Sequence, residues 1–176
     1  RRLAIYNLGG SPLGHEDLRN FVSDKLGIRA ATTVEPDQVL ITSGSLQALD
    51  LVNDLLLSPG DNVIVEEATY GGMLSRLQRL GVVVHGVRLD SDGVCPEHLR
   101  EVLDRCVSEG RPAKYLYTIP TVQNPTGSCM PLERRLKILE VMDEYETAIF
   151  EDDCYADLLW GCARPPTLWE LDQTDT

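Results

Sequence analysis

Several features that would assign this 176-residue chain to a specific class are missing from its sequence. No apolar run approaches the roughly 20 residues that a membrane-spanning helix needs. The first residues, Arg1 to Ala4, lack the apolar segment of a signal peptide. The five cysteines are odd in number and include no Cys-x-x-Cys pair, which fits reduced thiols in a cytoplasmic protein. We therefore predict a soluble, cytoplasmic protein with reduced thiols.

Positive charge and metal ligands are also scarce. Sixteen Lys and Arg residues stand against 28 Asp and Glu residues, giving a formal net charge of -12, which disfavours nucleic acid and anionic membranes. The one interior basic pair, Arg134-Arg135, falls in a helical pattern and is expected on a solvated face. The histidines, His15, His85 and His98, have no spacing that converges on an ion. No nucleic-acid partner, no membrane contact and no metal site are expected.

What the sequence does contain is a regular alternation of short apolar runs and amphipathic segments. Runs rich in β-branched and aromatic residues predict strands at 39–41, 63–65, 82–84, 115–119 and 148–150. Apolar residues at helical spacing predict helices at 16–26, 46–57 and 72–80, the first and third capped by Gly27 and Gly81, and further helices opening near Pro96 and Pro131. Such alternation requires crossover connections. The predicted class is α/β, a three-layer sandwich with a mostly parallel central sheet.

Ligands of such sheets bind beyond the carboxyl ends of the strands, so the functional site is expected in the four loops that follow the strands. The first, Thr42 to Ser45, runs into a helix whose N-H groups and dipole suit a phosphate, although Ser43 or Ser45 capping the helix would explain the same residues. In the second, Tyr70 precedes two glycines. Its ring could stack on a planar heterocycle or simply pack on the surface.

The other two loops carry polar side chains. Asn124 offers an amide donor, although Asn-Pro and Thr-Gly also have a purely conformational role in turns. The last strand leads into Glu151-Asp152-Asp153 and then Tyr155. These acids could be solvated, could bind a hard cation such as magnesium, or could pair with a protonated ring nitrogen.

Together, these loops resemble the successive motifs of fold-type I pyridoxal-phosphate enzymes. The motifs are residues 43–49, 66–70, 123–127 and 151–155. Their order and spacing are similar to those of aminotransferase classes I and II, especially the 2-aminoadipate and multisubstrate branch that includes the aminotransferase-like domains of MocR-type regulators. The resemblance implies the large domain of a pyridoxal-phosphate-dependent transferase, a homodimer in the complete protein, and amino acids and 2-oxo acids as substrates.

The resemblance also implies roles for individual residues. The backbone around Gly44, Ser45 and Leu46 would hold the phosphate of pyridoxal 5'-phosphate, with Leu46 standing where relatives usually have glutamine. Tyr70 would stack on the pyridine ring. The remaining contacts would come from Asn124 and Tyr155, which would donate to the phenolic oxygen, and from Asp152, which would pair with the pyridinium nitrogen. Asp152 and Tyr155 are the expected catalytic residues.

A lysine that matches the family's Schiff-base lysine is absent. Lys25, Lys114 and Lys137 lie in predicted helices or before a strand, and none has the serine-rich setting of the family motif. The substrate-binding arginine of relatives lies in a small C-terminal domain. We therefore interpret residues 1–30 as an N-terminal segment with the first helix, and residues 31–176 as an incomplete cofactor-binding domain. Alone, it should be inactive and should expose apolar surface.

Three other functions stay open from the sequence. The parent protein could be a MocR-type regulator that senses pyridoxal phosphate without turning over an amino acid. It could also be another fold-type I enzyme, such as a carbon-sulfur lyase, because the fold does not fix the reaction. A third possibility is a metal-dependent phosphate-binding protein that uses Asp152 and Asp153.

Overall fold

The computed structural model describes residues 11–30, 33–161 and 163–172. The chain divides into two units, residues 1–48 and 49–176, so the predicted boundary at residue 30 stays a prediction. The first unit is built on α1 (Glu16–Ala30) and a short 3-10 turn, η1 (Pro36–Gln38). Within it, the guanidinium of Arg19 donates to the carbonyl of Pro36 at 2.7 Å, and the hydroxyl of Ser23 donates to the carbonyl of Val34.

Two expectations for the first unit are wrong. Gly27 does not end the first helix, which continues to Ala30, since glycine inside a helix costs only about 1 kcal/mol and can be tolerated. Residues 39–41 form no strand. Among the described residues, their apolar run has one backbone hydrogen bond to a distant segment, from Ile41 N to Leu13 O at 2.8 Å, and a strand needs a continuous ladder.

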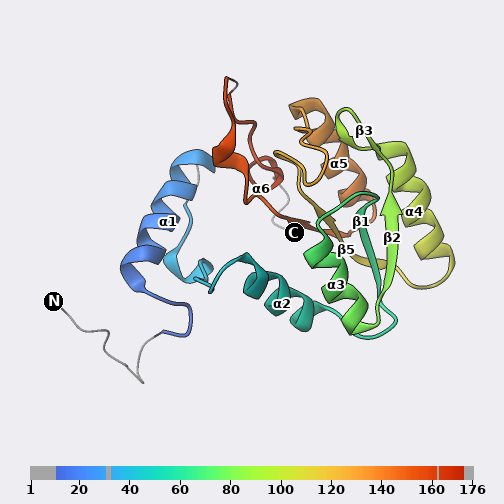
Figure 1. The fold of residues 1–176 in the computed structure, drawn as a ribbon, viewed down its shortest axis with the longest axis horizontal. Helices are drawn as coiled ribbons and strands as arrows, with labels where there is room; N and C mark the ends of the chain where they lie inside the picture. The colour runs from blue at the N-terminus through green and yellow to red at the C-terminus, as the bar shows by residue number, and fades with distance from the viewer. Residues whose placement is uncertain (1–10, 31–32, 162, 173–176) are drawn as a thin grey trace. The chain divides into compact units, whose positions relative to one another are not determined.

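The second unit contains a parallel sheet of four strands in the order β2-β1-β5-β6 (Figure 1). The strands are β1 (Asn62–Glu66), β2 (Val83–Val87), β5 (Ala113–Thr118) and β6 (Ala148–Glu151). A two-residue antiparallel ladder joins β3 (Leu89–Asp90) to β4 (Gly93–Val94) across a turn at residues 91–92. The predicted α/β class with a mostly parallel sheet is confirmed.

Helices cover both faces of this sheet. They are α2 (Ser45–Leu56), α3 (Gly71–Leu80), α4 (Pro96–Ser108) and α5 (Leu132–Glu144), followed by the short η2 (Ala156–Leu158) and α6 (Leu168–Leu171). Alternate residues of β1 and β5 enter two separate cores. One core contains Val63, Val65, Tyr115 and Tyr117 with Met73 and Leu77 of α3. The other contains Ile64 and Leu116 with side chains of α4 and α5, and each fully buried aliphatic side chain contributes about 1.5–3 kcal/mol.

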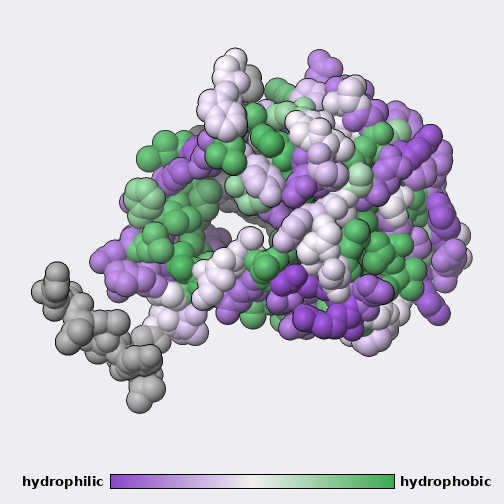
Figure 2. Space-filling view, in the orientation of Figure 1, coloured by the Kyte–Doolittle hydropathy of each residue, from purple (hydrophilic) through white to green (hydrophobic). Residues whose placement is uncertain are grey.

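Some apolar surface is left exposed. Val83 and Val84 of the edge strand β2 are 42% and 39% exposed, and Figure 2 shows hydrophobic side chains gathered over this edge. Leu55 and Trp160 are more than 80% exposed, at 83% and 84%. This agrees with the expectation of uncovered apolar surface. Within the ranges that the structure describes, no helix has both the length and the hydropathy of a membrane span.

Candidate functional site

The carboxyl ends of β1, β5 and β6 bring three of the four predicted loops to one edge of the sheet. The register pairs Val65 with Tyr117 and Tyr117 with Phe150, so the strands end side by side at Glu66, Thr118 and Glu151. The polar residues that follow these strands therefore lie close together, as expected for parallel strands.

Asp152 is held at this edge through both its backbone and its side chain. Its backbone N-H donates to the carbonyl of Thr118 at 2.9 Å, which extends the β5–β6 ladder by one residue. Its Oδ2 accepts from the hydroxyl of Tyr117 at 2.7 Å. Since Tyr117 belongs to the core beneath α3, the carboxylate of Asp152 lies on that side of the sheet.

The three consecutive acids have three different sets of partners. The carboxylate of Glu151 accepts from the backbone N-H groups of Leu168 and Trp169 at 2.9 and 3.0 Å, at the start of α6. Burial raises the pKa of Glu151. Asp153 forms an ion pair with Arg164. The acids therefore do not converge, and the described residues contain no cluster of three or more His, Cys, Asp or Glu able to hold a metal ion.

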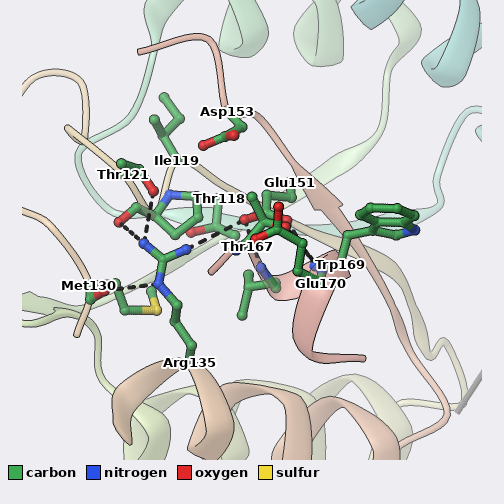
Figure 3. A network of polar contacts seen from close by, with 12 residues as sticks. Thr118, Ile119, Thr121, Met130, Arg135, Glu151, Asp153, Thr167, Trp169 and Glu170 are labelled. Carbon is green, nitrogen blue, oxygen red and sulfur yellow. Dashed lines mark hydrogen bonds and ion pairs between the residues drawn. The ribbon is translucent and has the colours of Figure 1, made fainter. Parts of the chain in front are cut away.

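Arg135 corrects the expectation of a solvated basic pair. Its side chain is 0% exposed and reaches from α5 to the loop after β5. Its guanidinium donates to the carbonyls of Met130 and Pro120, at 2.9 and 3.0 Å, and to the hydroxyl of Thr121, at 2.8 Å. Figure 3 shows the guanidinium between Met130 and Thr121. Nη1 of Arg135 lies 3.6 Å from Oε1 of Glu151, and burial lowers the pKa of the arginine. Arg135 therefore ties this loop to the end of β6.

The loop that Arg135 secures also carries Asn124. Its Nδ2 donates to the hydroxyl of Tyr155 at 3.3 Å, and the Asn124-Pro125 peptide bond is cis. Backbone hydrogen bonds from Gln123 to Ser128, at 2.8 Å, and from Met130 to Pro120 close the loop. Val122 adopts a left-handed conformation with φ +55°, which is unfavourable for a β-branched residue and is maintained here by these closures.

A buried acid, Glu66, supports the same loop from the end of β1. Oε1 of Glu66 accepts from the hydroxyl of Thr118 at 2.6 Å and from the N-H of Ile119 at 3.2 Å. Oε2 of Glu66 accepts from Nε2 of Gln123 at 2.8 Å, and the same nitrogen donates to the carbonyl of Ala68. Burial raises the pKa of Glu66 despite these hydrogen bonds. Glu66 thus connects the loop before Asn124 with the loop before Tyr70.

Tyr70 precedes α3, and its ring lies over the first turn of that helix. A Cβ atom at Gly72 would meet Cε1 and Cζ of the ring at 2.4 Å, so only glycine allows this approach without movement of the ring. Tyr70 and Tyr155 both pack against the core beneath α3. The missing Cβ of Gly72 therefore leaves room for the ring of Tyr70.

The turn predicted to hold a phosphate lies in the first unit, where Gly44, Ser45 and Leu46 are exposed. Gly44 has φ +85°, and α2 begins at Ser45. The carbonyl of Gly44 accepts from the hydroxyl of Thr42 at 3.0 Å, and the side chain of Gln47 accepts from the N-H of Ser43 at 2.6 Å. The first N-H groups of a helix have no partner within the helix, so the exposed start of α2 has donors of the kind that bind anions.

The opposite end of the sheet contains a hollow of about 430 Å³ at the start of β1 and β5. A polar group that lines this hollow bonds to a neighbouring loop: Nδ2 of Asn62 donates to the carbonyl of Arg111 at 2.5 Å. Lys114 lies 3.9 Å from Asp61 there, and Lys137 is exposed on α5. Neither lysine of the second unit is therefore at the carboxyl edge.

The sequence model of the aminotransferase class I and II family matches residues 5–175. This chain belongs to that family. The predicted resemblance is confirmed.

The family members that the chain resembles are longer proteins. It is 39% identical over 158 residues to the 2-aminoadipate transaminase of Thermus thermophilus, covering 90% of this chain and 37% of the relative. An archaeal alanine:glyoxylate aminotransferase structure matches with a TM-score of 0.86 and 35% identity, covering 93% of this chain and 40% of that one.

The α-aminoadipate aminotransferase LysN of Thermus thermophilus, whose crystal structure contains N-(5'-phosphopyridoxyl)-L-leucine, matches with a TM-score of 0.83 and 37% identity. That match covers 92% of this chain and 39% of LysN. The chain thus spans less than half the length of these aminotransferases.

Proposed function

We propose that this chain is part of a pyridoxal-phosphate-dependent aminotransferase that moves an amino group from an amino acid to a 2-oxo acid. One observation carries the proposal. Within a chain of the aminotransferase family, the carboxyl edge of the sheet holds a carboxylate, Asp152, on the side of the sheet where Tyr155 packs and receives the amide of Asn124.

The donors and acceptors of the chain fit this cofactor. Asp152 supplies the negative charge that holds a proton on a ring nitrogen. Asn124 and Tyr155 supply two donors, already in contact with each other, for a phenolic oxygen. Tyr70 supplies a ring for stacking, and the amides around Ser45 supply a phosphate site in the first unit. When bound, pyridoxal phosphate acts as the electron sink for removal of the substrate's α-proton.

The remaining catalytic groups would come from elsewhere in the longer protein. No lysine of the second unit lies at the carboxyl edge, so we propose that the lysine that binds the cofactor belongs to another segment. The arginine that binds the substrate carboxylate would also belong to another segment. The chain alone would then be inactive, and the complete enzyme would be a cytoplasmic homodimer.

The regulator and the lyase are the alternatives that share this cofactor site. Relatives at 39% and 32% identity are named as a transaminase and as an aromatic-amino-acid aminotransferase, which favours amino transfer. To test this, the full-length protein is incubated with pyridoxal phosphate, 2-oxoglutarate and each of a set of amino acids, and the products are measured. We expect one glutamate for each new 2-oxo acid. Bound cofactor without product would favour the regulator, and release of ammonia would favour the lyase. Absence of cofactor binding would overturn the proposal.

A further inference from the structure

Two buried tyrosines lie two residues apart on β5 and point to the same side of the sheet. Tyr115 is 1% exposed and Tyr117 is 0% exposed. The ring of Phe150 on β6 meets both edge-on, with centroids 5.8 Å from Tyr115 and 5.7 Å from Tyr117. The two side chains therefore have nearly the same packing, and they differ in what their hydroxyl groups contact.

The hydroxyl of Tyr115 makes its hydrogen bond inside the core. It donates to Oδ1 of Asn53 on α2 at 2.5 Å, and Asn53 is itself 1% exposed. The hydroxyl of Tyr117 instead donates to Oδ2 of Asp152 at 2.7 Å, at the carboxyl edge. Edge-to-face packing against Phe150 fixes the direction of the Tyr117 ring and hence the position of its hydroxyl.

We propose that Tyr117 is a positioning residue for the cofactor: its hydroxyl holds one oxygen of Asp152, which orients the carboxylate toward a protonated ring nitrogen. This inference rests on the proposed function. Asp152 follows β6 directly, and its backbone bond to Thr118 fixes the position of its backbone but not the direction of its carboxylate. The bond from Tyr117 to Oδ2 restrains the direction of the carboxylate, and the thiol of Cys154 is its other side-chain neighbour. A carboxylate held in advance binds its partner with a smaller loss of side-chain entropy.

The tyrosine hydroxyl is suited to act as a lasting donor. Burial, together with the hydrogen bond to Asp152, raises the pKa of Tyr117 far above its ordinary value. It therefore keeps its proton across the working range of an enzyme. A buried hydroxyl also needs a partner, and Asp152 provides it.

The test compares Tyr117→Phe with its matched control, Tyr115→Phe, in the full-length protein. Pyridoxal-phosphate affinity is measured by titrating the visible absorbance of the bound cofactor, and folding is followed by thermal unfolding. We expect Tyr117→Phe to weaken cofactor binding about tenfold, the loss of one hydrogen bond to a charged group. Tyr115→Phe should lower the unfolding temperature, because Asn53 loses its donor, but should leave cofactor affinity within about twofold of the wild type.

A double-mutant cycle with Asp152→Asn separates positioning from a general effect on the fold. If Tyr117 acts through Asp152, adding Tyr117→Phe to Asp152→Asn should change affinity by less than about twofold. Equal losses from Tyr117→Phe with and without Asp152→Asn would overturn the inference, as would equal affinity of Tyr117→Phe and wild type. Those outcomes leave the proposed function standing, whereas a wild-type protein that binds no pyridoxal phosphate overturns both.

Discussion

The side-chain amide of Asn124 lies 3.3 Å from the hydroxyl of Tyr155, although the two residues are 31 positions apart and belong to different loops. Both loops follow neighbouring parallel strands, β5 and β6, which is why they meet. The contact joins two of the residues that the family resemblance assigns to one oxygen of the cofactor.

If both groups donate to that oxygen, their removal should not be additive. In the full-length protein we expect Asn124→Ala and Tyr155→Phe each to weaken pyridoxal-phosphate binding about tenfold, and the double variant to lose less than the product of the two. Absorbance titration measures the affinities. Tyr145→Phe is the matched control, since its hydroxyl bonds to Asp104 on the α4–α5 side. Strictly additive losses would argue against a shared oxygen.

The contact between Tyr70 and Gly72 makes a second prediction. Gly72→Ala places a methyl group 2.4 Å from the ring atoms and should displace the ring, weakening cofactor binding several-fold, about 1 kcal/mol. Gly71→Ala has open space at the same helix start and should leave binding unchanged. Unfolding temperatures control for helix propensity, which favours alanine in both variants. Equal cofactor affinities of the two variants would remove the proposed role of the ring.

Because Glu66 is buried, the stability of the fold should depend on pH. Burial raises its pKa, so above the ordinary carboxyl value of 4.5 the folded protein keeps a proton that the unfolded chain has already released. The free energy of unfolding therefore falls as pH rises through that range. Glu66→Gln does not titrate there, so the unfolding temperature of the wild type minus that of Glu66→Gln should decrease as the pH rises above 4.5.

Glu101→Gln removes an exposed carboxylate from α4 and controls for the change in net charge. A constant difference between wild type and Glu66→Gln at every pH would contradict the burial-driven shift.

Replacing the buried Arg135 by lysine should greatly reduce the stability of the fold. Lysine keeps the charge, but one ammonium group does not span the carbonyls of Met130 and Pro120 and the hydroxyl of Thr121. Arg135→Lys should cost about 3–5 kcal/mol in chemical unfolding, as expected when a buried charge network is broken. Arg100→Lys alters an exposed pair with Glu144 and should have a much smaller effect. Similar losses for the two variants would show that burial of Arg135 contributes little.

Much of the fold could be predicted because local periodicity determines it. The strands of the second unit alternate between two apolar cores, and its helices begin or end at Pro96, Gly81 and Pro131 as expected. The prediction of a strand at 39–41 was wrong because a strand depends on distant residues as well as on local periodicity. An apolar run becomes a strand only beside a pairing partner, and sequence alone does not supply one.

The site was predictable in its loops but not in its supporting contacts. Motif order pointed to Asp152, Asn124 and Tyr155. The burial of Arg135 depends on carbonyl groups that converge only after folding, so its charge wrongly suggested a solvated face. The periodicity of β5 placed Tyr117 in the core but gave no sign that its hydroxyl reaches Asp152.

The most direct test of the proposed function is Asp152→Ala in the full-length protein, compared with Asp153→Ala, whose native carboxylate pairs with Arg164. Amino transfer, cofactor absorbance and thermal unfolding are measured on the same preparations. We predict that Asp152→Ala remains folded and loses transfer activity about a hundredfold or more, the scale of a removed electrostatic contact to the reacting group, while Asp153→Ala retains most activity. A folded, cofactor-loaded Asp152→Ala protein with wild-type activity would contradict the proposal.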